Sequence, residues 1–258
     1  MIHPLACVDP AARLGEGVEI GPFCYVQGNV EIGDGTRLIS NVTVMDGARI
    51  GRNCTVFPGA VVGACPQDLK FKGEETVAIV GDGTTLRECV TIHRGTASKG
   101  RTVVGKNCLI MAYCHVAHDC HLGDNIIMSN AVQLGGEVVV DDFAVIGGGT
   151  LVHQFCHLGS YIMVQGGALI NKDIPPYVLA AREPISFTGV NVIGLRRHAF
   201  SHESIARIQE IYRILYNSGL NIAEAVDRLP LMMEPSEELD KILGFINASG
   251  RGVLRGGV

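Results

Sequence analysis

Several histidines in the middle of this sequence are candidates for proton transfer. They are His93, His115, His118, His121 and His153. An imidazole near its ordinary pKa accepts a hydroxyl proton at neutral pH, so a cluster of these side chains predicts general base catalysis. Asp119 follows His118 and would orient its ring. Because adjacent side chains of a strand point to opposite faces, only a corner in the chain would let these two neighbours touch.

A period of six residues predicts the elements that bring these histidines together. From residue 2 to residue 170, every sixth residue is apolar at 26 of 29 positions, and the exceptions are Asp68, Glu74 and Ser98. The residue two places before each apolar one is small or β-branched, and such pairs share the inward face of an extended strand. Glycine often follows the apolar residue, as at Gly21, where we expect it to give a corner backbone freedom.

Three such hexads per coil form a triangular prism in which each coil covers the inward face of the next. The sequence therefore predicts an all-β parallel β-helix over residues 1–177, with loops near 68–79 and 98–103, where the period pauses. Hexads on one face of the prism recur every third one. One face carries a line of His93, His118, Gly136 and His153, and both loops leave the prism beside it. The spacing does not give the hand of the helix.

A helical pattern replaces the six-residue period after residue 176. Helix starts are predicted at three capping residues, which are Ser201, Asn221 (with Glu224 three residues on) and Ser236. The first helix would end near Gly219 and the last before Gly250. Residues 178–258 are therefore predicted to form a small α-helical C-terminal domain.

The composition excludes several classes of partner. The net charge is -5, with 21 basic and 26 acidic residues, so no overall positive field favours nucleic acid or an anionic membrane. No secretion signal is visible, and the uncharged stretch 143–171 fits the repeat better than a membrane span. Six of the nine cysteines occupy the small inward position as core fillers, and so many buried thiols favour the reducing cytoplasm.

Six segments together resemble one family, the hexapeptide-repeat UDP-N-acetylglucosamine O-acyltransferases that begin lipid A biosynthesis. They are QDLK at 67–70, TIHRGT at 91–96, HVAHDC at 115–120, VHQFC at 152–156, DIPPYV at 173–178 and GVN at 189–191. The resemblance covers nearly the whole chain and implies a left-handed parallel β-helix. It also implies a homotrimer with sites between adjacent subunits, and transfer of an (R)-3-hydroxyacyl group from acyl carrier protein to the 3-hydroxyl of UDP-N-acetylglucosamine.

The resemblance implies roles for particular residues. His118 would be the general base, Asp119 would support its imidazolium, and the Gly136 amide would stabilise the tetrahedral oxyanion. The acyl donor is acyl carrier protein carrying phosphopantetheine, and no metal or other cofactor is implied. Positions matching substrate or nucleotide contacts are Asp68, Lys70, His93, His115, His153, Gln154, Asn191 and Arg197.

Two further features concern the acyl donor. Gly166 matches the position where the family limits acyl length by side-chain bulk, so a glycine predicts a long chain of about fourteen carbons or more. Carrier protein is acidic, and a basic docking patch is predicted at Arg196, Arg197, Arg251 and Arg255. An ordinary solvated basic face is the alternative interpretation of these arginines.

Other interpretations stay open at this stage. Three imidazoles, those of His93, His115 and His118, could hold zinc as in hexapeptide-repeat carbonic anhydrases. Such prisms also serve as non-catalytic scaffolds. The sequence departs from the family's pattern at Glu137, Ile193, His198 and Arg182-Glu183. These departures leave open a 3-amino sugar as the acceptor, which would give an amide.

Overall fold

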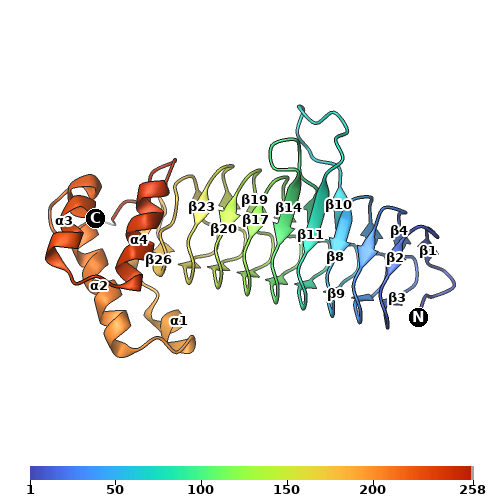
Figure 1. The fold of residues 1–258 in the computed structure, drawn as a ribbon, viewed down its shortest axis with the longest axis horizontal. Helices are drawn as coiled ribbons and strands as arrows, with labels where there is room; N and C mark the ends of the chain where they lie inside the picture. Colours follow the sequence, from blue (N-terminus) through green and yellow to red (C-terminus); the bar gives the residue numbers. More distant parts are fainter. Residues whose placement is uncertain (257–258) are drawn as a thin grey trace.

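The computed structural model describes residues 1–256 and shows an elongated prism that carries helices at one end (Figure 1). Short strands, all parallel except the last, form three sheets of nine, eight and ten strands. Neighbours within a sheet are three strands apart in the chain along almost the whole prism, because each coil contributes one strand to each sheet. The predicted parallel β-helix with three hexads per coil is therefore confirmed.

The sheet that carries the histidines is called the first sheet. Its strands are β1 (Cys7–Val8), β4 (Tyr25–Val26), β7 (Thr43–Val44), β10 (Val61–Ala64), β13 (Thr91–His93), β16 (His115–Val116), β19 (Gln133–Leu134), β22 (Leu151–Val152) and β25 (Leu169–Ile170). The second sheet consists of β2 (Arg13–Leu14), β5 (Glu31–Ile32), β8 (Ala48–Ile50), β11 (Val77–Val80), β14 (Arg101–Val104), β17 (His121–Leu122), β20 (Val139–Val140) and β23 (His157–Leu158). The third sheet consists of β3 (Glu19–Ile20), β6 (Arg37–Leu38), β9 (Thr55–Val56), β12 (Thr85–Leu86), β15 (Leu109–Ile110), β18 (Ile127–Met128), β21 (Val145–Ile146), β24 (Met163–Val164), β26 (Val178–Ala181) and β27 (Ser186–Val190).

The core of the prism is built from the two inward residues of each hexad. Val116 pairs in register with Ile92 on one side and Leu134 on the other, and all three are buried. The six cysteines predicted at the small inward position are buried free thiols, so their role as core fillers is confirmed. Burying each large aliphatic side chain contributes about 1.5 to 3 kcal/mol, and the sum over the coils holds the prism together.

The corners of the prism differ from the expectation at glycine. At most corners the residue three places after the large inward residue takes the left-handed conformation, as at Phe23 (φ 58°) and Asn53 (φ 53°). Gly21, which follows Ile20 directly, is outside that region, but a Cβ there would lie 1.7 Å from the Ile39 carbonyl oxygen. The reason predicted for a glycine at position 21 was therefore wrong. Glycine is required there because neighbouring coils approach closely, not because the corner needs backbone freedom.

Two loops leave the prism between strands of the first and second sheets (Figure 1). They span residues 65–76, between β10 and β11, and residues 94–100, between β13 and β14. The boundaries predicted at 68–79 and 98–103 run into the strands that follow, because β11 and β14 pair along four residues each. The sheet also continues beyond residue 177, since β26 pairs in parallel with β24 and β27 folds back antiparallel to it.

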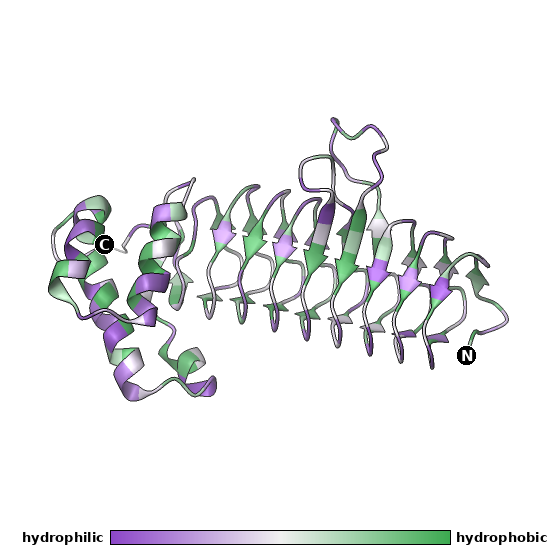
Figure 2. Cartoon of the chain, viewed as in Figure 1, coloured by the Kyte–Doolittle hydropathy of each residue, from purple (hydrophilic) through white to green (hydrophobic). Residues whose placement is uncertain are grey.

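Four helices follow the last strand. They are α1 (Val192–Arg197), α2 (His202–Asn217), α3 (Ile222–Met232) and α4 (Glu237–Ala248). The predicted caps are confirmed, since Ser201, Asn221 and Ser236 each accept a backbone N–H of their helix and Asn221 forms a capping box with Glu224. The sequence patterns did not predict α1. Hydrophobic and hydrophilic residues mix along the helices (Figure 2), and across residues 1–256 none is long and apolar enough to cross a membrane.

Candidate active site

The first sheet brings three of the predicted histidines together. His93 ends β13, His115 begins β16 on the next coil, and their rings meet edge to face with centroids 4.6 Å apart. His118 stands at the corner that follows β16, with 19% of its side chain exposed. Thr91 fixes the His115 ring, because its Oγ1 lies 2.7 Å from Nδ1. Register within the sheet therefore creates the cluster that the six-residue period predicted.

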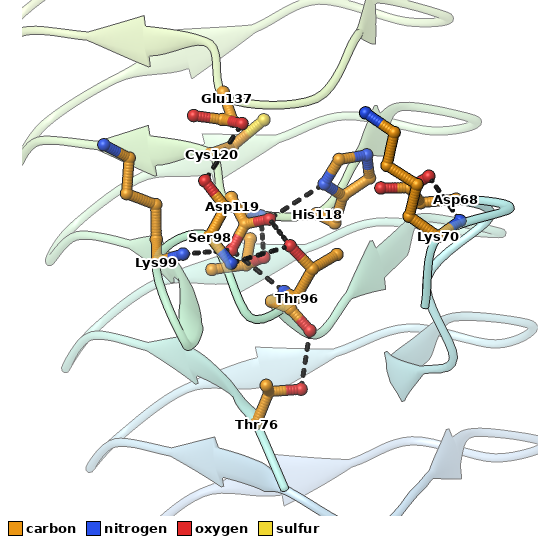
Figure 3. A network of polar contacts seen from close by, with 12 residues as sticks. Asp68, Lys70, Thr76, Thr96, Ser98, Lys99, His118, Asp119, Cys120 and Glu137 are labelled. Carbon is orange, nitrogen blue, oxygen red and sulfur yellow. Dashed lines mark hydrogen bonds and ion pairs between the residues drawn. The ribbon is translucent and has the colours of Figure 1, made fainter. Parts of the chain in front are cut away.

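A left-handed corner turns Asp119 toward its neighbour. Asp119 has φ 61°, and its Oδ2 lies 2.9 Å from Nδ1 of His118 (Figure 3). The carboxylate is fully buried. Because an ionised carboxylate only accepts hydrogen bonds, Nδ1 of His118 carries the hydrogen and Nε2 is left as an acceptor. This is the tautomer that a general base requires.

Gly136 lies on the next coil against the other side of the His118 ring. A Cβ at position 136 would be 2.6 Å from both Nε2 and Cε1 of His118, so only glycine leaves this space open. Within residues 1–256 no acceptor takes the Gly136 N–H. The arrangement thus places a free imidazole nitrogen and a free backbone donor side by side, as acyl transfer through a tetrahedral intermediate requires.

The histidines around His118 are held neutral. Burial, together with His115 and His118, lowers the pKa of His93 to about 4. Burial, together with His118, also lowers the pKa of His115. Neutral neighbours at pH 7 do not repel the proton that His118 must take up. In contrast, burial raises the pKa of the adjacent Cys120 thiol to about 12, so this thiol is no nucleophile at neutral pH.

The loop at 65–76 lies on the His118 side of the His118–Asp119 pair. Asp68 and Lys70 face that side in Figure 3, and the Asp68 carboxylate accepts from the Lys70 backbone N–H at 2.9 Å. Arg94, the first residue of the loop at 94–100, packs its guanidinium over the Phe71 ring, 5.3 Å from the centroid, and so connects the two loops. The two predicted loop residues therefore lie at the mouth of the candidate site.

The structure places other predicted residues further away. His121 begins β17 in the second sheet, beyond the Asp119 corner, so its predicted membership of the cluster was wrong. His153 and Gln154 are exposed on the single coil that lies next to Gly136. Three predicted residues belong to the segment of α1, which lies at the helical end of the prism (Figure 1) and includes Asn191, Arg196 and Arg197.

Two of these distant residues have contacts that bear on their predicted roles. Asn191 caps α1 through Oδ1 and donates from Nδ2 to the Tyr161 carbonyl at 2.9 Å. Gly166 is exposed on the coil above Gly148, whose carbonyl oxygen would lie 3.0 Å from a Cβ at position 166. Gly166 follows β24 of the third sheet and Asn191 precedes α1, whereas His118 follows β16 of the first sheet. Their contribution to substrate binding therefore stays a prediction.

The imidazoles do not converge as zinc ligands. His118 commits Nδ1 to Asp119 and His115 commits Nδ1 to Thr91, while the rings of His93 and His115 meet edge to face. No group of three histidine, cysteine or acidic side chains suited to a metal occurs in the part of the chain described, residues 1–256. The absence of a metal stays a prediction, because a histidine whose Nδ1 is hydrogen-bonded to a carboxylate can still bind a metal through Nε2.

A prism of six-residue repeats with a buried carboxylate–imidazole pair at one corner defines a hexapeptide-repeat transferase. Residues 11–38 and 101–136 match the family model of bacterial transferase hexapeptide repeats. Residues 173–254 match the model for domain 2 of UDP N-acetylglucosamine O-acyltransferase. The chain belongs to the family of acyl-[acyl-carrier-protein]–UDP-N-acetylglucosamine O-acyltransferases, and its prism is a left-handed parallel β-helix.

Full-length relatives and solved structures carry this assignment. The acyltransferase of Trichlorobacter lovleyi is 51% identical over 259 residues, which cover 99% of each chain. That of Halorhodospira halophila is 45% identical over 255 residues, which cover 98% of this chain and 99% of the relative. The UDP-N-acetylglucosamine acyltransferase structure from Bacteroides fragilis has a TM-score of 0.97 at 51% identity and covers 99% of this chain and 100% of its own. That from Arabidopsis has a TM-score of 0.88 at 32% identity and covers 99% and 100%.

Sequence reasoning missed two threonines that hold side chains of the site in place. Thr91 and Thr96 flank His93 within the TIHRGT segment, which was singled out only for its likeness to the family. Thr91 contacts His115, and Thr96 donates to Asp119 across 23 residues of sequence. The available signal was that both threonines lie within three residues of His93. Their hydrogen-bond partners depend on which coils are adjacent, and the sequence alone does not give those partners.

Proposed function

We propose that this protein transfers an (R)-3-hydroxyacyl group from acyl carrier protein to the 3-hydroxyl of UDP-N-acetylglucosamine, the first step of lipid A biosynthesis. One observation supports the proposal above all others. Nδ1 of His118 lies 2.9 Å from the buried Asp119 carboxylate, which leaves Nε2 unprotonated beside the open space at Gly136. A base held in this tautomer next to a free N–H donor suits attack on a thioester.

The chemistry follows from that geometry. The sugar hydroxyl attacks the thioester carbonyl carbon while its proton passes to Nε2 of His118, and Asp119 stabilises the resulting imidazolium. The carbonyl oxygen becomes an oxyanion that accepts from the Gly136 N–H. The tetrahedral intermediate then breaks its carbon–sulfur bond, and the imidazolium returns the proton to the phosphopantetheine thiolate. A thioester is already an activated acyl group, so the proposed reaction uses no metal or further cofactor.

The neighbouring polar residues supply the substrate contacts in this proposal. His93 and His115 form the floor beside His118, and the Lys70 ammonium at the mouth suits the diphosphate of the nucleotide. The remaining predicted contacts are those of Asp68, His153, Gln154, Asn191, Arg196 and Arg197. Gly166 leaves room for the acyl chain, and the exposed arginines near the C-terminal end suit an acidic carrier protein.

We also propose that the active form is a homotrimer in the cytoplasm. In one chain α1 lies at the helical end of the prism (Figure 1), and Gly166 follows β24 of the third sheet, whereas His118 follows β16 of the first sheet. A neighbouring subunit would bring such surfaces together. The third sheet carries a column of apolar side chains on its outer face. The column consists of residues paired in register on successive strands, namely Leu109, Ile127, Val145, Met163 and Leu179. A continuous apolar column of this kind favours association. The nine free thiols favour a reducing compartment.

An acyl-transfer assay tests the function. Purified full-length protein is given hydroxyacyl carrier proteins of several chain lengths with either the 3-hydroxy or the 3-amino UDP-sugar, and the product is identified by mass spectrometry. Ester formation on the 3-hydroxy sugar is expected. No ester with any donor, or faster amide formation on the amino sugar, would contradict the proposal. Sedimentation equilibrium should give the mass of three chains of 27.5 kDa each.

A further inference from the structure

The Asp119 carboxylate receives more hydrogen bonds from the loop at 94–100 than from its histidine. Oδ1 accepts from the backbone N–H groups of Thr96 at 2.9 Å and Lys99 at 3.2 Å. Oδ2 accepts from the Thr96 hydroxyl at 2.6 Å and from Nδ1 of His118 at 2.9 Å (Figure 3). The loop therefore wraps the far side of the carboxylate, and the Thr96 hydroxyl is the one side-chain donor that it contributes.

The hydrogen bonds of Thr96 fix the direction of its hydroxyl. Its Oγ1 accepts from the Ser98 backbone N–H at 3.2 Å, so the hydroxyl hydrogen points to Asp119. The Thr96 carbonyl accepts from the Gly100 N–H at 2.7 Å, and the preceding Gly95 carbonyl accepts from the Thr76 hydroxyl at 2.6 Å. Thr96 is itself buried, with 7% of its surface exposed.

We propose that Thr96 is a positioning residue for the acyl transfer, because its hydroxyl shares with His118 a single oxygen of Asp119 and thereby sets the orientation and basicity of the imidazole. The proposal rests on the function assigned to His118 above. It adds a third member, Thr96, to the His118–Asp119 pair, supplied by the second loop rather than by the coils of the prism.

The direction of the effect follows from competition for one oxygen. A short hydrogen bond from the hydroxyl draws charge from Oδ2, so that oxygen attracts the imidazolium less strongly. Without the hydroxyl, Oδ2 would interact more strongly with the protonated ring and His118 would hold its proton to higher pH. The other titratable groups around the pair are His93 from β13, His115 from β16, and Asp68 and Lys70 from the first loop. Lys99 and Glu137 lie on the Asp119 side (Figure 3). The Thr96 hydroxyl is hydrogen-bonded to none of these side chains.

The test measures His118 itself rather than turnover. Full-length protein with isotope-labelled histidine is titrated by NMR, and the His118 signal is identified by its loss in His118→Ala. Thr96→Val and Thr96→Ala both remove the hydroxyl and should raise the His118 midpoint by about 0.5 to 1 pH unit. Thr96→Ser keeps the hydroxyl and should titrate like the natural protein. An unchanged midpoint in either folded variant that lacks the hydroxyl would overturn the proposal.

Thr84→Val is the matched control. Thr84 is also buried, and its hydroxyl donates to the Gly105 carbonyl at 2.8 Å and accepts from the Cys108 N–H at 3.1 Å, away from the dyad. The titration midpoint of His118 should not move in the Thr84→Val variant. A shift there equal to that in Thr96→Val would also refute a specific role for Thr96. Because the titration needs no substrate, a protein that shows the Thr96 effect but transfers no acyl group would contradict the proposed function alone.

The same set of variants separates positioning from binding in the acyl-transfer assay. In Thr96→Val the acid limb of the pH profile of kcat/KM should move to higher pH, as the NMR titration midpoint of His118 does. The value of kcat should fall about tenfold, as expected for a misplaced base. The KM for the nucleotide sugar should stay constant, because Thr96 lies behind the carboxylate. A raised KM with unchanged kcat would show that the loop acts on binding and would refute the positioning role.

Discussion

Gly136 and His118 fit each other across one coil of the prism, since a Cβ on Gly136 would lie 2.6 Å from Nε2 of His118. Gly136→Ala should therefore displace the ring or block the approach of the hydroxyl, and kcat should fall about a hundredfold. Steady-state kinetics at several donor concentrations would show it. Gly244→Ala is the control, because nothing lies within 4 Å of a Cβ there. Equal activity in both variants would contradict the fit.

His118→Ala should abolish the base while leaving the fold intact. General base catalysis contributes about a hundredfold to ten-thousandfold, so kcat should fall by that amount. The hydrophobic residues of the coil are unchanged, and thermal unfolding should occur near the natural temperature. Undiminished turnover in a folded His118→Ala protein would refute the assignment of the base.

Asp119→Asn should act through the tautomer of His118. An amide presents both a donor and an acceptor, so Nδ1 of His118 is no longer held as the donor and the hydrogen can move to Nε2. The loop N–H groups of Thr96 and Lys99 would also lose an ionised acceptor. We expect kcat to fall about a hundredfold or more, with little change in KM. A selective rise in KM would instead place Asp119 in substrate binding.

The buried His93 should make stability fall in acid. Its pKa is lowered to about 4 in the folded chain, whereas the unfolded chain takes up the proton near the ordinary value of 6.5. Between these values only the unfolded state binds the proton, so stability falls as the pH drops from 6.5 toward 4. The contribution is about 2 to 3 kcal/mol.

Urea unfolding of the natural protein and of His93→Leu at pH 7 and pH 5 would measure this contribution. The leucine variant should lose less stability on acidification, because it lacks the group that titrates. Identical pH dependence in the two proteins would mean that His93 is not the buried histidine responsible.

Gly166→Met should shorten the preferred acyl donor. Position 166 is exposed, and a side chain there would have to pass within 3.0 Å of the Gly148 carbonyl oxygen and then fill the space above that coil. Activity with donors of about fourteen carbons should fall about tenfold relative to shorter donors, in line with the few kcal/mol that hydrophobic pockets discriminate. Leu169→Met, at a residue 65% exposed on the neighbouring sheet, is the control. An unshifted preference in Gly166→Met would argue against the predicted role.

Much of the fold could be predicted because it repeats. Large residues such as Val116 and small ones such as Cys114 recur with a period of six, and only an inward-facing strand with a corner after it satisfies that pattern. The helix starts at Ser201, Asn221 and Ser236 were also predictable, because a cap depends on residues three positions away. Short α1 carries no comparable pattern and was missed.

The sequence by itself determined the prism, the sheet on which His93, His115 and His118 gather, and the position of both loops, because these depend on spacing along the chain. Only the tertiary structure decided what each side chain touches. The left-handed corner at Asp119 turns two neighbours toward each other, and stacking of coils brings Thr96 to the same carboxylate. His121 lies beyond that corner on another sheet. Contacts of this kind depend on the direction of side chains between adjacent coils, and a period in the sequence does not encode that direction.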